Sequence, residues 1–209
     1  GGGGGAEGGG GGVGKGADGV DRGCGRRRCA VNDGVEGAVQ YGDSMGVLMV
    51  HAAGNDGANV DSTDNFPSPY YADGGRAQRW IEVGASSWEG GEKLAASFSN
   101  YGAERVDVFA PGHSIYSTVP DDAYERNDGT SMAAPMVSGL AALIMAHYPS
   151  LTATDVRTII LETATPYRNR TVARPGDGET VPFGTLSDTG AVVNAHAALR
   201  RAADRVAAQ

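Results

Sequence analysis

A serine ahead of an apolar run is the first residue of this sequence that could do chemistry. Ser131 lies in the stretch 129–135, which reads Gly-Thr-Ser-Met-Ala-Ala-Pro. Ser and Thr before such a run most often cap a helix, because the hydroxyl accepts a hydrogen bond from a free backbone N–H. The same serine could attack a carbonyl if a base removed its proton, and a helix N-terminus would aim N–H groups at the carbonyl oxygen. Ser131 alone leaves both interpretations open.

Asn55 is the second candidate. It lies in the small-residue turn 52–57, Ala-Ala-Gly-Asn-Asp-Gly, shortly after the apolar run 47–50. A side-chain amide in such a turn can donate a hydrogen bond to an oxygen that becomes negatively charged during a reaction. Asn is also an ordinary turn residue, so the pattern by itself indicates only an amide behind an apolar strand.

Apolar strands and helices alternate around these two residues. The continuous run 47–50 predicts a central strand of a sheet that is covered on both faces, and 80–84 and 106–109 predict further strands. Residues 131–147 are apolar nearly all round, which predicts a buried helix, and Pro135 is tolerable because it falls near the first turn. This alternation predicts an α/β fold with a mainly parallel sheet.

Helices are also predicted elsewhere. Val35 to Met45 has the pattern of a short amphipathic helix, with Gly46 where a C-cap would lie. Thr152 to Asp155 resembles a capping box at the start of a helix. A last helix is expected over residues 192–207.

Three ordered segments resemble the subtilase family (peptidase family S8). They are residues 50–57, residues 106–112 with 114–118, and the stretch from 129 through 143, with weaker matches at 96–102 and 190–199. The resemblance covers about residues 35–200 and implies a subtilisin-like three-layer fold and serine-type endopeptidase activity on protein or peptide substrates. It favours the nucleophile interpretation of Ser131 over the helix cap.

The same resemblance implies roles for individual residues. Ser131 would be the nucleophile, and the side chain of Asn55 with the Ser131 N–H would form an oxyanion hole. Ala53 and Gly54 would line the pocket for the substrate side chain just before the cut. The family also implies a location outside the cell or in the cell envelope.

The family pattern is incomplete in this sequence. A histidine base and an aspartate should precede the serine, in the order Asp, His, Ser. None of the histidines at positions 51, 113, 147 and 196 lies in the expected His-Gly-Thr-His motif. We expect His51 to be a packed or hydrogen-bonded core residue. Asp188 begins an Asp-Thr-Gly triplet, but it follows Ser131 and no apolar strand precedes it, so a turn leading into a helix is expected.

Two hypotheses follow for the domain and its function. Residues 1–30 would be a Gly-rich, low-complexity, disordered segment, and residues 31–209 the C-terminal part of an N-terminally truncated subtilase catalytic domain. The alternative is a catalytically inactive pseudo-peptidase or peptide-binding domain that keeps the fold without the base.

Charge and hydropathy exclude some partners. The formal net charge of −8 argues against a nucleic-acid-binding protein. The longest apolar run, Met132 to Met145, is interrupted by Pro, Ser and Gly and is too short to span a bilayer. The Gly-rich start is not a signal-peptide pattern. We therefore expect no nucleic-acid or membrane partner, and no oligomeric state is predicted.

No cofactor or metal site is predicted. Structural calcium is common in the family, but the acidic residues 56, 61 and 64 lack a diagnostic spacing. Cys24 and Cys29 lack the further ligands of a zinc site, and they would be either a small disulfide loop or an incidental pair. Residues 12–16 resemble a phosphate-binding loop, but no apolar strand precedes them and no Ser or Thr follows Lys15.

Overall fold

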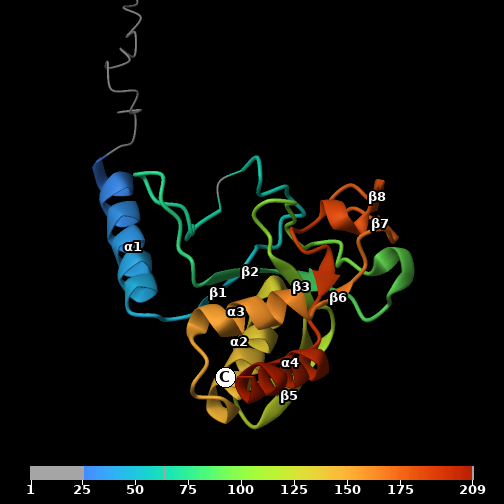
Figure 1. The fold of residues 1–209 in the computed structure, drawn as a ribbon. Coiled ribbons are helices and arrows are strands. Elements are labelled where there is room, and N and C mark those ends of the chain that lie inside the picture. Colours follow the sequence, from blue (N-terminus) through green and yellow to red (C-terminus); the bar gives the residue numbers. More distant parts are fainter. Residues whose placement is uncertain (1–25, 64, 209) are drawn as a thin grey trace, which may run out of the picture.

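A five-stranded sheet forms the middle of the fold (Figure 1). The structure is a computed structural model that describes residues 26–63 and 65–208. The strand order is β1-β2-β3-β9-β6; the first four strands are parallel, and β6 is antiparallel to β9. The sheet strands are β1 (Met49–Ala52), β2 (Trp80–Ser86), β3 (Val108–Pro111), β6 (Thr165–Pro166) and β9 (Ala191–Val192). The expected mainly parallel sheet is confirmed.

The other elements lie around this sheet. The helices are α1 (Arg26–Ser44), α2 (Thr130–His147), α3 (Ala153–Glu162) and α4 (Ala195–Ala207). Two antiparallel hairpins are formed by β4 (Ile115–Val119) with β5 (Ala123–Asn127) and by β7 (Thr171–Ala173) with β8 (Thr180–Pro182). Two short 3-10 helices are η1 (Gly91–Lys93) and η2 (Phe183–Thr185).

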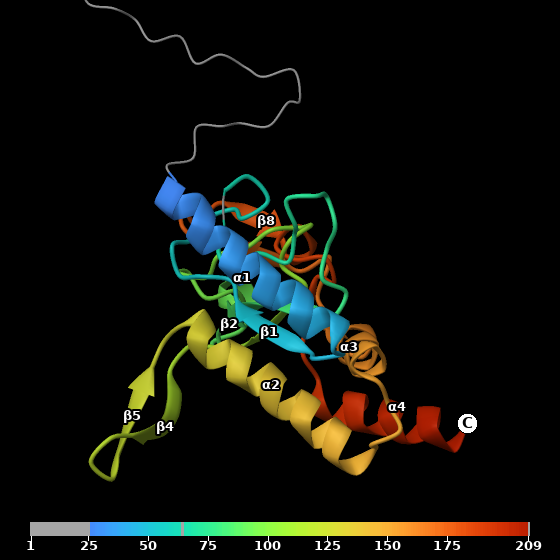
Figure 2. The same cartoon turned by 90° about the vertical axis from the view of Figure 1, so that its left-hand side faces the viewer.

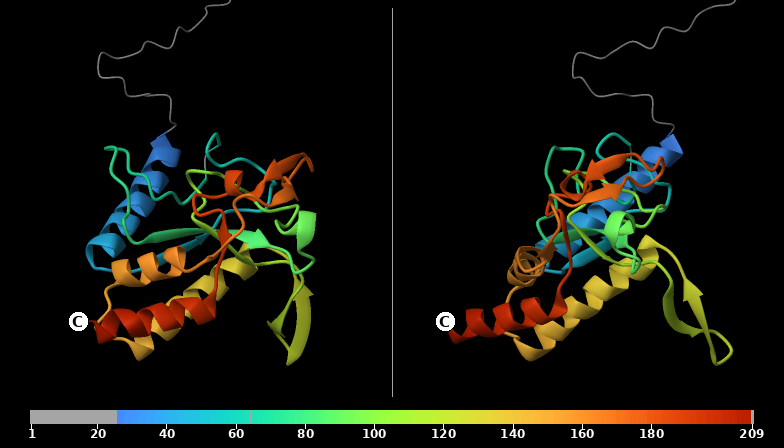
Figure 3. Two further views of the ribbon diagram at one scale, coloured as in Figure 1. Left: turned by 45° about the vertical axis from the view of Figure 1, so that its right-hand side comes forward. Right: turned by 90° about the vertical axis from the view of Figure 1, so that its right-hand side faces the viewer.

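The helices divide between the two faces of the sheet, which gives three layers. Figure 2 shows α1 crossing in front of β1 and β2. Figure 3 shows α2, α3 and α4 together on the opposite side. Val39 of α1 packs with Trp80 of β2, whereas Ile81 and Val83, the neighbouring inward-facing residues of β2, belong to the cluster that contains α2 and α3. The alternation follows from the period of two in a strand.

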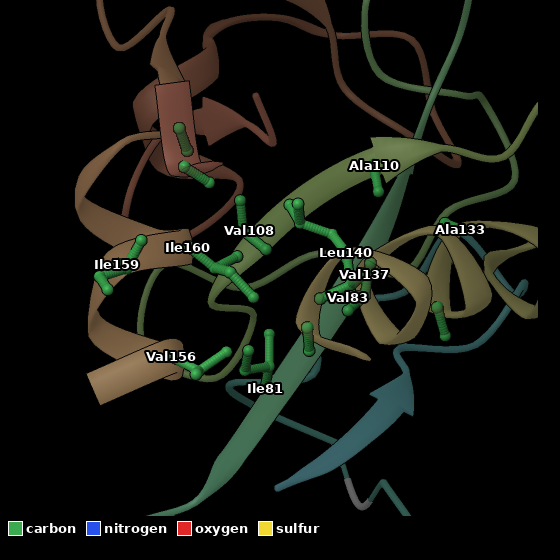
Figure 4. Packing of buried hydrophobic residues seen from close by; sticks show 14 of the residues in the cluster. Ile81, Val83, Val108, Ala110, Ala133, Val137, Leu140, Val156, Ile159 and Ile160 are labelled. Carbon is green, nitrogen blue, oxygen red and sulfur yellow. The ribbon is translucent and has the colours of Figure 1, made fainter. Parts of the chain in front are cut away.

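The main core lies between the sheet and the three helices (Figure 4). Val137 and Ile144 of α2 are fully buried there, as are Ile159 and Ile160 of α3. By length and composition alone α2 would be able to cross a membrane, and its 18 residues exceed the apolar run expected from the sequence. Its packing against β1, β2 and β3 identifies it as a core helix of the domain. Only the face toward the sheet is buried, and Met136 and Leu143 on the other side are exposed, so the prediction of a helix buried nearly all round is wrong.

One partly buried ion pair links α3 to the sheet. Asp107 Oδ1 lies 2.7 Å from Arg157 Nη2 of α3, and Asp107 Oδ2 accepts the Glu82 N–H at 2.7 Å. Arg157 Nε also donates to the carbonyl oxygen of Trp80 at 2.7 Å. Burial raises the pKa of Asp107, while the nearby Arg157 charge acts in the opposite direction.

Local signals located α3 and the end of α1 correctly. Thr152 and Asp155 form the predicted capping box, with the Asp155 N–H donating to Thr152 Oγ1 at 3.1 Å. Gly46, two residues beyond the end of α1, has φ +78°, as is common for the glycine that ends a helix. The helix begins at Arg26, earlier than predicted, and arginines favour helices. Residues 26–30 are therefore helical, while residues 1–25, with Cys24 and the glycine-rich loop, lie outside the described residues.

The prediction that 47–50 forms a central strand is wrong. Within the described residues β1 stands at the end of the strand order and pairs only with β2. An apolar run indicates only that both faces of a strand are covered. Both faces of β1 are covered, because Val50 packs toward α2 and Met49 packs toward α1. The pattern says nothing about neighbours in the plane of the sheet.

Candidate active site

The C-terminal ends of the parallel strands β1, β2 and β3 converge on the N-terminus of α2. The Gly129 N–H, just before α2, donates to the Gly112 carbonyl oxygen at 2.8 Å, and the Gly112 N–H donates to the Ser86 carbonyl oxygen at 3.0 Å. A Cβ on Gly112 would lie 2.7 Å from the Ala85 Cβ and 2.7 Å from the Gly129 oxygen. A glycine at position 112 is therefore what lets the start of α2 approach the sheet.

Asn55 meets the first residue of α2. Its Oδ1 accepts hydrogen bonds from the Thr130 N–H at 2.9 Å and the Thr130 hydroxyl at 2.9 Å. Thr130 Oγ1 in turn accepts the Gly54 N–H at 3.1 Å. Since a backbone N–H can only donate, the atom facing Thr130 must be the amide oxygen, and Nδ2 faces the other way. Nδ2 lies 3.4 Å from the position that a Cβ would take on Gly129.

Ser131 is exposed and is the second residue of α2. Its backbone N–H belongs to the first turn, where no carbonyl of the helix is available. No acceptor for it is found within residues 26–63 and 65–208. The candidates Ser131 and Asn55, far apart in the chain, are thus brought to the same edge of the sheet. Two donors there, the Ser131 N–H and Asn55 Nδ2, have no acceptor among the described residues.

Ala53 and Gly54 lie at the end of β1, as expected, but in different surroundings. Ala53 is 0% exposed and packs in a second hydrophobic cluster with Val60 and Phe109. Gly54 is half-buried and has φ +100°. Of these two residues, only Gly54 is accessible to a ligand. The substrate-pocket role of both stays a prediction.

The four histidines all lie in the described part of the chain, and none hydrogen-bonds to Ser131 there. His51 Nδ1 lies 2.8 Å from Glu82 Oε1, which agrees with its expected role as a hydrogen-bonded core residue. His113 Nδ1 lies 2.8 Å from Ser87 Oγ. His147 is the last residue of α2, and His196 lies in α4.

Asp188 lies in a turn, as predicted. Its N–H donates to the Val106 carbonyl oxygen at 2.8 Å, and Gly190 has φ +56°. The turn leads into β9 first and then into α4, so the predicted helix starts three residues later than expected, at Ala195. Asp188 is thus part of the scaffold beside β3.

No group of three or more His, Cys, Asp and Glu side chains is arranged to hold a metal ion among the described residues. Asp61 instead accepts the Arg105 N–H at 2.9 Å. Calcium binding therefore stays an expectation from family resemblance.

Sequence reasoning did not assign a role to two residues at this site. Thr130 appeared only as part of a possible helix cap, yet it orients the Asn55 amide. Asn100, buried under the Asn55 turn, lay in a weaker matching segment. A single Asn in such a segment is a weak signal, because its hydrogen-bond partners are distant in the sequence.

Several known proteins are similar to this chain in sequence and in fold. The sequence model of the subtilase family (peptidase S8) matches residues 13–186. The chain is 43% identical to Subtilisin DY of Bacillus licheniformis over 129 residues, which are 61% of this chain and 43% of that protein. It is 37% identical to Alkaline elastase YaB of Bacillus sp. (strain YaB) over 167 residues, 79% of this chain and 36% of that protein.

Solved structures show the same fold. A structure of the self-cleaved protease domain of PatA aligns with a TM-score of 0.59 at 28% identity, covering 81% of this chain and 55% of that one. A structure on subtilase cytotoxin SubAB assembly aligns with a TM-score of 0.64 at 24% identity, covering 85% and 55%.

The match of the family model over most of the sequence means that this chain belongs to the subtilase family. The subtilisin-like three-layer fold is confirmed with it. The chain spans less than half the length of the curated relatives named above.

Proposed function

We propose that this chain carries the nucleophile and oxyanion-binding side of a serine endopeptidase active site that cleaves protein or peptide substrates. Ser131 attacks the scissile carbonyl, and Asn55 Nδ2 and the Ser131 N–H hold the developing negative charge on the carbonyl oxygen. One observation carries the proposal: Thr130 binds Asn55 Oδ1 and so leaves the amide nitrogen free beside the start of α2.

A base is still needed to remove the Ser131 proton. The family resemblance implies a histidine oriented by an aspartate. Each histidine of this chain has another place in the fold, so we propose that the base is supplied from outside this sequence. An extracellular or cell-envelope location and structural calcium belong to the same proposal and rest on the family alone.

The base can be replaced by a small molecule in the test. A fluorophosphonate probe is reacted with the full chain at rising imidazole concentration, and labelled serines are found by peptide mass spectrometry. We expect imidazole to accelerate labelling of Ser131 selectively, and Ser131→Ala to abolish it. Ser117, an exposed serine on β4, is the internal control for general reactivity.

The oxyanion role is tested in the same assay. Asn55→Ala should slow the imidazole-driven labelling by about 10²- to 10³-fold, the effect of removing one such donor in a subtilisin. Equal labelling of Ser131 and Ser117 would contradict the nucleophile role. Rapid labelling without imidazole would contradict the claim that the chain lacks a base.

A second candidate is a pseudo-peptidase or peptide-binding domain. It is favoured by the lack of a histidine hydrogen-bonded to Ser131 within the described residues. This alternative predicts that Ser131 has no selectivity over Ser117 in imidazole, since a site kept only for binding needs no oriented oxyanion donors.

A further inference from the structure

Asn100 is buried beneath the turn that carries Asn55. Its side chain is 5% exposed. Oδ1 accepts the N–H groups of Asp56 and Ala58, each at 2.9 Å. Nδ2 donates to the Ala53 carbonyl oxygen at 2.8 Å. Nδ2 also lies 3.5 Å from Asp56 Oδ2. One side chain thus binds the turn on both sides of Asn55, through three short hydrogen bonds to its backbone and this longer contact.

The backbone of the turn is shaped around this side chain. The Asn100 N–H donates to the Gly54 carbonyl oxygen at 2.9 Å. A Cβ on Gly54 would lie 2.3 Å from Asn100 Nδ2, far closer than two such atoms can approach, and Gly54 also has φ +100°. Gly54 therefore leaves the space that Asn100 fills.

A short series of contacts leads from Asn100 to the candidate nucleophile. Asn100 holds the backbone on both sides of Asn55; Asn55 Oδ1 accepts the Thr130 N–H; and Thr130 immediately precedes Ser131. Among the described contacts Asn100 does not hydrogen-bond to the Asn55 side chain or to Ser131. Any effect on the site must pass through the backbone of the turn.

We propose that Asn100 is a positioning residue, whose three short hydrogen bonds fix residues 53–58 so that Asn55 Oδ1 engages Thr130 and Asn55 Nδ2 stays free beside the start of α2. The inference rests on the proposed function, since it assigns a purpose to the position of Asn55. The position of Asn55 can be measured without any catalytic assay, so the inference and the proposed function are tested separately.

The test compares two buried polar residues that are neighbours in sequence. Asn100→Ala removes all side-chain contacts of Asn100 to the turn. Ser99→Ala is the matched control: Ser99 is 0% exposed, and its Oγ accepts the Ala85 N–H at 2.9 Å and donates to the Asn100 carbonyl oxygen at 2.8 Å. Both variants lose buried hydrogen bonds, but only the first loses side-chain contacts to the turn.

The measurement is amide hydrogen exchange of the full chain, followed by NMR. The reporter is the Thr130 N–H, which lies on α2 and is protected by Asn55 Oδ1. We expect Asn100→Ala to accelerate its exchange by about tenfold relative to Ser99→Ala, which corresponds to about 1.4 kcal/mol. Exchange of the Asp56 and Ala58 N–H groups, which Asn100 Oδ1 accepts, should also accelerate. If Asn100→Ala folds poorly, Asn100→Ser takes its place, because it keeps a small polar group. Exchange of the Thr130 N–H should again be faster than in Ser99→Ala.

Equal Thr130 exchange in the Asn100 variants and Ser99→Ala would overturn the inference. This outcome is separate from failure of the proposed function. Unselective phosphonylation of Ser131 would remove the catalytic purpose, yet it would leave the exchange comparison intact.

Discussion

The substitution Gly54→Ala puts the close fit between the Asn55 turn and Asn100 to a quantitative test. Gly54 has φ +100°, and an added Cβ would lie 2.3 Å from Asn100 Nδ2 and 3.2 Å from Asn100 Cγ. The left-handed backbone costs an alanine about 1–2 kcal/mol. Displacing Asn100 costs about 1–3 kcal/mol more through overpacking and a lost hydrogen bond. A smaller unfolded-state entropy of alanine offsets about 0.4–1 kcal/mol.

We therefore expect Gly54→Ala to lower the free energy of unfolding by about 3 kcal/mol. Gly46→Ala is the matched control, because Gly46 also has a positive φ, +78°, but no atom lies within 4 Å of its added Cβ. Gly46→Ala should lower the free energy of unfolding by only about 1 kcal/mol, which is the cost of the positive φ alone. Guanidinium denaturation followed by tryptophan fluorescence measures both, since Trp80 is 3% exposed.

A double-mutant cycle identifies the cause of the difference. In an Asn100→Ala background, Gly54→Ala should cost no more than Gly46→Ala, which gives a coupling of about 2 kcal/mol between positions 54 and 100. If Gly54→Ala cost the same in both backgrounds, the clash with Asn100 would not be the cause and the reasoning would be refuted.

Three further predictions concern the scaffold. Hydrogen bonds from the Thr152 hydroxyl and N–H hold the pKa of Asp155 below its usual value, so their stabilisation is complete above about pH 4 and is lost as pH falls through the folded-state pKa. Asp155→Asn should flatten the fall in unfolding free energy below pH 4; an unchanged pH profile would contradict this. Arg157→Met should cost about 3 kcal/mol in denaturant unfolding, because it leaves Asp107 buried without its 2.7 Å partner; a neutral result would mean that Asp107 is protonated. Ile144→Ala should cost about 2–5 kcal/mol by the same measurement, since Ile144 is 0% exposed, and a loss under 1 kcal/mol would indicate a collapsible site.

Helices with local signals were predictable from the sequence. The capping box at Thr152 and the glycine after α1 depend on residues a few positions apart, and both appear in the structure. The apolar pattern of 131–147 likewise predicted the helix itself, but not that one of its faces is exposed. Such features need no knowledge of distant contacts.

The hairpins and the place of β1 were not predictable in the same way. Residues of β4 and β5 are mostly exposed, so those strands carry no apolar alternation to detect. β1 carries an apolar run because both its faces are covered, and that pattern is shared by central and edge strands. A central strand differs from an edge strand only in that its backbone is hydrogen-bonded to a neighbouring strand on both sides, which the sequence pattern does not show.

The candidate site was predictable in its members but not in its connections. Matching motifs identified Ser131 and Asn55 and put them in one family pattern. The contacts that orient them involve Thr130, 75 positions from Asn55, and Asn100, 44 positions from Asp56. A hydrogen bond across such a separation depends on the completed sheet, which single-sequence patterns do not encode.

That long separation has a consequence for folding. The Asn55 turn, the segment around Asn100 and the start of α2 must all be in place before the Thr130 N–H finds Asn55 Oδ1, because each comes from a different part of the chain. Contacts that close large loops carry a high entropic cost and slow folding. The donors of the proposed oxyanion hole are thus assembled only when all three segments have docked, and a partly folded chain would lack that geometry.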